Sequence, residues 1–162
     1  MIRISPRNIN YREVIDEYGR ETCVPHRDCS ARDAAVSAAN TELSAAEADE
    51  AIKKKELENA RDLLDSLKAE RANVEASQAQ YDNIYISVAN SGRTLITEEN
   101  VGGIRDGYKC LNDYLNAVNS TIDSCIKERD RCVEAYAKAV ERTTKAKIAL
   151  YKAKQIPCVW VC

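Results

Sequence analysis

The fold is decided by residues 30–89, which read SARDAAVSAANTELSAAEADEAIKKKELENARDLLDSLKAERANVEASQAQYDNIYISVA and contain neither Gly nor Pro. Residues 106–156 form a second stretch of this kind, with one early Gly, Gly107, and no Pro. Most residues that interrupt helices lie between the two stretches, above all Gly92, Gly102 and Gly103. Because the helix breakers concentrate there, the pattern predicts an all-α protein in which two long helices reverse direction and run antiparallel.

Both stretches carry a loose heptad of apolar residues, which is typical of helices that pack side by side. In the first stretch the two seam positions run Val36, Leu43, Glu50, Leu57, Leu64, Arg71, Gln78, Tyr85 and Ala39, Ala46, Lys53, Ala60, Leu67, Val74, Tyr81, Val88. In the second they run Leu111, Val118, Cys125, Cys132, Ala139, Ala146, Ala153 and Leu115, Ile122, Arg129, Tyr136, Thr143, Leu150. These seams predict a coiled-coil-like hairpin.

The N-terminal residues predict a third, shorter helix. Ser5-Pro6 resembles an N-cap followed by Pro at the first helical position, and Gly19 resembles a C-terminal stop, so a helix is expected near 6–18. Ser30, with Asp33 three residues later, resembles a cap at the start of the first long helix. The expected organisation is a single domain, 1–162, made of an N-terminal helix and connector (1–29), a long helix (30–89), a turn (90–105), a long helix (106–156) and a Cys-containing tail (157–162).

Composition argues against several classes of partner. The chain has 162 residues, of which 31% are charged with mixed signs and a net charge of -2, so it has no basic stripe for nucleic acid. No run approaches the roughly 18 apolar residues that a membrane-spanning helix needs. The first residues lack the apolar core of a secretory signal, which predicts a cytoplasmic protein or one exported by a route independent of a signal peptide.

Seven cysteines fall into two groups. Cys110, Cys125 and Cys132 lie inside the second helical stretch, and the last two occupy its seam, which predicts buried, inert thiols. The other four flank the helices, and matched helix lengths place them together at the open end of the hairpin. This terminal cluster, which includes the only histidine, comprises Cys23, His26, Cys29, Cys158 and Cys162.

Three states of the terminal cluster compete. Disulfides between Cys23 or Cys29 and Cys158 or Cys162 would close loops of more than a hundred residues and contribute up to ~5 kcal/mol. A zinc site would need thiolates and imidazole in tetrahedral geometry, and the spacings C-x2-H-x2-C and C-x3-C are irregular for zinc modules. Free thiols are the third state. A reducing compartment favours free thiols or metal, whereas an oxidising one favours disulfides.

The residues do not indicate an enzyme. A cysteine nucleophile needs a base, and His26 is the only imidazole in the chain. No Glu-x-x-His motif is present for a carboxylate metal site in a bundle. No catalytic residue or cofactor is therefore predicted, with zinc kept as a minor alternative.

Apolar residues also lie beside the seams, where a two-helix hairpin cannot cover them. A hairpin has one mutual interface, and bundles of three or four helices bury wider stripes. We therefore expect this surface to pack against another helical chain or a second copy; the alternative is that the N-terminal helix, through Ile9, Val14 and Ile15, folds back over it. The predicted partner-binding residues are Ile52, Leu63, Ile84, Ile126, Val133, Val140 and Ile148.

The opening residues 1–6, MIRISP, resemble the start of the small WXG-like (ESX-like) proteins of the bacterial type VII secretion system. The Ala-rich helix, the polar Gly-containing turn and the matched second helix resemble the same family. The resemblance implies a hairpin without a signal peptide that dimerises or bundles with the helical leader of a secreted toxin. The chain departs from the family at the turn, where Ser91-Gly92 replaces Trp-x-Gly. It also departs from the family's export signal, an aromatic residue followed four residues later by an acid, because the residue four positions after Tyr151 is Gln155. A structural coiled-coil scaffold or assembly adaptor is the alternative function.

Overall fold

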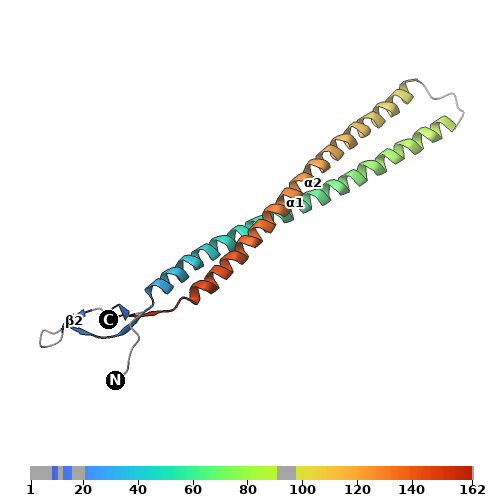
Figure 1. Ribbon diagram of the computed structural model, residues 1–162. Helices are drawn as coiled ribbons and strands as arrows, with labels where there is room; N and C mark the ends of the chain where they lie inside the picture. The colour runs from blue at the N-terminus through green and yellow to red at the C-terminus, as the bar shows by residue number, and fades with distance from the viewer. Residues whose placement is uncertain (1–8, 11–12, 16–20, 91–97, 162) are drawn as a thin grey trace. The chain divides into compact units, whose positions relative to one another are not determined.

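A computed structural model describes residues 9–10, 13–15, 21–90 and 98–161, with side chains over 24–83 and 106–161. Helix α1 spans Ser30–Asn90 and helix α2 spans Glu98–Lys154. The two helices pack antiparallel to one another (Figure 1), which confirms the predicted helical hairpin. The first helix begins at the predicted residue and ends one residue later than predicted.

Every described seam position is buried or partly buried, and no described residue outside the two seams is fully buried. Leu57, Leu64 and Val74 are buried on α1, and Val118 and Ile122 are buried on α2. Glu50 and Lys53 stay partly buried although they are charged, because long side chains can lay their methylene stems along the interface. The heptad therefore located the helix–helix interface correctly.

The described residues also form short strands at the ends of the chain. They are β1 (Ile9–Asn10), β2 (Glu13–Ile15), β3 (Glu21–Cys23), β4 (His26–Asp28) and β5 (Val159–Val161). Strand β5 lies in the centre of a three-stranded sheet, with β1 parallel on one side and β4 antiparallel on the other. Strands β2 and β3 form a separate antiparallel pair.

The predicted N-terminal helix near 6–18 is wrong for the residues that can be compared. Ile9–Asn10 and Glu13–Ile15 are strands, while residues 6–8, 11–12 and 16–18 lie outside the described residues. Ile9, Val14 and Ile15 are β-branched, which favours strands, and partner strands are available in β5 and β3. The connector and the tail, predicted without regular structure, contain β3, β4 and β5.

The predicted turn at 90–105 is too long. Helix α2 begins at Glu98, eight residues before the predicted start at 106, and continues through Gly102 and Gly103. A glycine costs a helix only about 1 kcal/mol, and acidic residues such as Glu98 favour a helix N-terminus. The second helix also ends at Lys154 instead of 156. Residues 91–97 lie outside the described residues.

The chain forms two compact units, each of which contains part of both helices. The central unit is Ile52–Tyr136, and its core is aliphatic: Leu64, Val118 and Ile122 form a cluster against which Leu67, Cys125 and Ile126 pack. Gly107 also has a packing role here, since a Cβ at that position would lie 2.8 Å from Cε1 of Tyr81. The Oη of Tyr114 on α2 donates a hydrogen bond of 2.9 Å to Oε1 of Glu70 on α1.

The terminal unit comprises Met1–Ala51 and Ala137–Cys162 and has a different core. Its buried side chains are small: Ala46 on α1, and Ala139, Thr143, Ala146 and Ala153 on α2. Alanine buries little apolar area, so this interface gains less from the hydrophobic effect than the aliphatic one does. The strands and the disulfide described below belong to this unit.

Candidate interaction surface

The structure leaves most of the predicted partner-binding side chains in solvent. Ile126 is the exception, because it packs partly buried against the core of the central unit. The side chain of Ile84 lies outside the described residues. The exposed members are Ile52 and Leu63 on α1, and Val133, Val140 and Ile148 on α2.

In the terminal unit the exposed large apolar residues of α2 lie on one stripe; the others, Val24, Ile156, Val159 and Trp160, lie outside the two helices. Val140, Thr144, Ile148 and Tyr151 follow one another at spacings of four, four and three residues, so they share one face of the helix. All four are exposed, with Ile148 at 50% and Tyr151 at 66%. We call these four residues the α2 stripe. Tyr151 is not among the partner-binding residues predicted from the sequence, although its position three residues after Ile148 places it on the same face.

An open hollow of about 550 Å³ lies along α1 in the same unit. The residues that line it are small or polar: Asp33, Val36, Ser37, Asn40, Thr41 and Ser44. The Oγ1 of Thr41 is already bonded to the carbonyl oxygen of Ser37 at 3.0 Å, so part of this polar surface is satisfied within the helix. Small side chains let another backbone come close to α1.

Ion pairs across the two helices identify which of their faces meet. On one side, Arg142 of α2 donates to Glu42 of α1, with Nε to Oε1 at 2.9 Å, and its Nη1 lies 3.8 Å from Oδ2 of Asp49. On the other side, Nζ of Lys147 lies 4.0 Å from Oε1 of Glu47. The hydrogen bond from Arg142 holds the pKa of Glu42 below its ordinary value.

The two helical segments of the terminal unit carry opposite charge. Residues 30–51 of α1 contain five acidic residues and one Arg, a net charge of -4, whereas residues 137–154 of α2 contain six basic residues and one Glu, a net charge of +5. Three of these basic residues form ion pairs within the unit. Arg142 and Lys147 pair with acidic residues of α1, and Nζ of Lys145 lies 2.6 Å from Oε1 of Glu141 on α2. Among the described residues, Lys152 and Lys154 make no ion pair.

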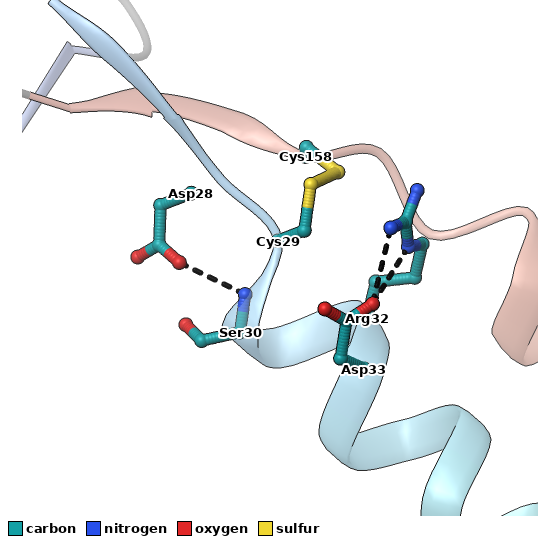
Figure 2. The surroundings of a disulfide bond; sticks show 6 residues. All are labelled: Asp28, Cys29, Ser30, Arg32, Asp33 and Cys158. Atoms are coloured by element: carbon teal, nitrogen blue, oxygen red, sulfur yellow. Dashed lines mark hydrogen bonds and ion pairs between the residues drawn. A yellow bond between two sulfur atoms is a disulfide. The ribbon is translucent and has the colours of Figure 1, made fainter.

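A disulfide between Cys29 and Cys158 joins the start of α1 to the residues after α2 (Figure 2). The two cysteines continue the register of β4 and β5, in which Asp28 lies opposite Val159, and their Cα atoms are 4.4 Å apart. This confirms the prediction that Cys29 and Cys158 lie together at the open end of the hairpin. Cys162 and the side chain of Cys23 lie outside the described residues.

Asp28 caps α1 next to this disulfide. Its Oδ1 accepts a hydrogen bond of 2.8 Å from the backbone N–H of Ser30, and this bond lowers the pKa of Asp28 (Figure 2). Asp33, predicted to complete the cap, instead accepts bonds from the guanidinium of its neighbour Arg32. The backbone N–H of Asp33 donates to the carbonyl oxygen of Cys29 at 2.9 Å, which closes the first turn of the helix.

When the Cys29–Cys158 disulfide is formed, two of the candidate zinc ligands present no thiolate and cannot bind the metal. His26 is exposed, with Nδ1 3.5 Å from the carbonyl oxygen of Val24. No group of three or more potential ligands is assembled among the described residues. Zinc binding by the reduced cluster stays an untested prediction.

The helical cysteines differ in exposure. Cys110 is exposed, Cys125 is partly buried, and Cys132 is buried in the seam. Burial, with a smaller effect from Glu128, raises the pKa of Cys132; its Sγ lies 3.8 Å from Oε1 of Glu128. Since the thiolate is the reactive form, Cys132 is suited to packing and poorly suited to nucleophilic chemistry.

No family model, curated protein or solved structure matches the chain. In addition, no helix in the described part of the chain has a stretch long and apolar enough to cross a membrane.

Proposed function

We propose that this chain is a non-enzymatic helical interaction protein, which buries the α2 stripe against another helical chain or a second copy of itself. The observation that carries the proposal is the exposure of Ile148 and Tyr151 beside Val140 on one helix face. Apolar side chains that gather on one face of a helix favour burial in an interface of three or more helices.

The alternative prediction is that an N-terminal helix of the same chain folds back and covers the exposed apolar surface. The described residues of that segment, Ile9–Asn10 and Glu13–Ile15, pair as strands with β5 and β3 and do not form a helix. This favours a partner over a self-contained three-helix bundle. The non-enzymatic part of the proposal is supported by His26, the only histidine, which is exposed and whose neighbour Cys29 is held in a disulfide.

The finer form of the proposal is a small partner or targeting factor of type VII secretion that bundles with the helical domain of a secreted toxin. Its support is the resemblance of residues 1–6 and of the two-helix arrangement to WXG-like proteins. The alternative is a structural coiled-coil scaffold or assembly adaptor, which the long seams support equally well. The two differ in the partner: a toxin's helical leader in the first case and structural proteins in the second.

Affinity purification from the native host, followed by mass spectrometry under non-reducing conditions, tests this function. We expect a helical protein to co-purify with the wild-type chain and to be lost from the variant Ile148→Ser with Tyr151→Ser. Sedimentation of the purified chain over a range of concentrations measures self-association. A folded monomer that does not self-associate and recovers no helical protein would refute the interaction function.

A further inference from the structure

We propose that the Cys29–Cys158 disulfide is a redox clasp: a dithiol that reduces it opens the terminal unit, while the central unit stays folded. Opening means here that residues 30–51 of α1 and 137–154 of α2 lose their mutual packing. Where the proposed interaction function holds, the oxidised chain is then the form that binds the partner, and this consequence alone rests on that function.

The two chain segments of the terminal unit depend on the disulfide for a connection at the open end of the hairpin. Residues 1–51 and 137–162 are separated in sequence by the whole of the central unit, 52–136. The central unit is one continuous stretch of chain, so its two helical segments stay connected in either redox state. A cross-link removes conformations from the open state, and its reduction returns them. Reduction therefore acts first on the terminal unit.

The side chains buried in the terminal unit hold it together only weakly. Four of the five are alanines, and the fifth, Thr143, has a hydroxyl with no hydrogen-bond partner among the described residues. The central unit instead buries leucine, isoleucine and valine side chains. Because the hydrophobic effect scales with buried apolar area, the terminal unit retains less stabilisation than the central unit once the bond is cut.

The polar contacts of the terminal unit do not replace the bond. The ion pairs that cross between its helices, Arg142 with Glu42 and Lys147 with Glu47, are exposed, and exposed ion pairs contribute little to stability. Strand β4 pairs with β5 over three residues, next to the disulfide. So short a pairing needs further support in water, and the disulfide supplies it.

The disulfide is attached where it controls both helices. The carbonyl oxygen of Cys29 accepts the 2.9 Å hydrogen bond from the N–H of Asp33 that closes the first turn of α1. Cys158 lies four residues after Lys154, the last residue of α2. With their Cα atoms 4.4 Å apart, the two cysteines hold the start of α1 beside the residues that leave α2 (Figure 2). The helix ends cannot move apart while the bond is intact.

Separation of the helix ends would also disorder the α2 stripe. Most of the stability of a helix in a protein comes from the packing of its apolar face, so a helix end that loses its packing partner frays. The stripe, from Val140 to Tyr151, lies wholly within the part of α2 that belongs to the terminal unit. The reduced chain therefore lacks an ordered surface for a partner to bind.

A dithiol can reach this bond and reduce it. Cys29 and Cys158 are each only partly buried. One thiolate of the dithiol attacks a sulfur and breaks the S–S bond, which gives a mixed disulfide and a cysteine thiolate; the second thiol then displaces the other cysteine. The protein disulfide gains two electrons and two protons and becomes two thiols, and the dithiol is oxidised to a disulfide. Cys110, Cys125 and Cys132 are free thiols before and after this reaction.

Hydrogen–deuterium exchange of the full chain, oxidised and after treatment with dithiothreitol, tests the opening. We expect amides in 30–51 and 137–154 to exchange at least about tenfold faster after reduction, because the restraint on the open state is gone. Amides in 57–74 and 115–132, around the aliphatic core, should change by less than about twofold. The variant Cys29→Ser with Cys158→Ser should show the reduced pattern without dithiothreitol and should not respond to it.

Two further variants show which cysteines cause the response. Cys110→Ser removes an exposed thiol of α2, and Cys23→Ser with Cys162→Ser removes the other two terminal cysteines; both should respond to dithiothreitol as the wild type does. A response that is lost in the second of these variants would overturn the assignment to Cys29 and Cys158. Equal acceleration in both units, or none in either, would overturn the clasp, because the bond would then stabilise the whole chain or neither part.

Partner binding is measured separately, by affinity purification from the native host. A helical protein recovered by the wild type should be recovered about tenfold less by Cys29→Ser with Cys158→Ser, because only the closed fraction of the chain binds, and equally by Cys110→Ser. Equal recovery by all three would overturn the link between the clasp and binding. If none of them recovers a helical protein, the interaction function is refuted, and the exchange pattern still decides whether reduction opens the terminal unit.

Discussion

Replacing Thr143 with valine should make the protein more stable. Thr143 lies in the alanine-rich core of the terminal unit and is 3% exposed, and its Oγ1 has no hydrogen-bond partner among the described residues. Its neighbour Thr144 is exposed and donates from Oγ1 to the carbonyl oxygen of Val140 at 2.9 Å. The two threonines therefore present the same side chain in opposite circumstances, one buried and unpaired and the other exposed and paired.

The expected gain follows from the environment of the hydroxyl. A buried hydroxyl without a partner costs about 1–3 kcal/mol in proteins, and valine has nearly the same shape with a methyl group in its place. Threonine and valine have similar helix propensities, so the backbone contributes little to the difference. Thr143→Val should raise the free energy of unfolding by about 1–3 kcal/mol, and each kcal/mol corresponds to roughly 2–4 °C in Tm for a chain of this size.

The assay is thermal and urea unfolding of the oxidised protein, followed by circular dichroism at the helix band. Thr144→Val is the matched control and should change the free energy of unfolding by less than about 0.5 kcal/mol, since Thr144 is exposed. If Thr143→Val is no more stable than the wild type, the hydroxyl must have a partner, such as a buried water, and the reasoning is wrong.

Three further predictions concern stability. Leu64→Ala should cost about 2–5 kcal/mol because Leu64 is 2% exposed in the central core, while Leu63→Ala, at an exposed neighbour, should cost less than about 1 kcal/mol; equal losses in urea unfolding would contradict this. Cys29→Ser with Cys158→Ser should lower stability by up to about 5 kcal/mol, because the bond spans a sequence separation of 129, and peptide mapping without reductant should recover the linked pair from the wild type only. The lowered pKa of Glu42 means that the unfolded chain takes up its proton first as pH falls. This stabilisation is complete above the ordinary glutamate pKa, declines below it, and is gone once the pH has fallen through the lowered pKa of the folded state; in Glu42→Gln the acid-side loss of Tm should be smaller than in the wild type.

The long helices could be predicted because their signal is spread over many residues. The seam assigned as Leu57, Leu64 and Val74 on α1 and Val118 and Ile122 on α2 is the buried one, since a stripe repeated over eight heptads outweighs single exceptions such as Lys53. The meeting of Cys29 with Cys158 followed from the same regularity, because matched helices bring their outer ends together.

The strands could not be predicted because their signal is not local. Glu13–Ile15 and Val159–Val161 are three residues long, and β5 becomes the centre of a sheet only because the hairpin returns it to β1 and β4. Short apolar runs fit a helix or a strand equally well until a partner strand is known. The early start of α2 is not evident from the sequence for a related reason: Gly102 and Gly103 predict a break locally, but a long helix tolerates the cost of two glycines.

The Cys29–Cys158 bond also determines how the molecule would carry a mechanical load. A pull on the two ends of the chain passes along β4 to Cys29, across the two sulfurs to Cys158, and out through β5. The chain between the two cysteines, which contains both helices, lies on a side loop that bears none of this tension. As long as the bond is intact, the protein behaves under a pull on its ends as a short covalent link with the hairpin attached to it, and only reduction would bring the helices into the line of force.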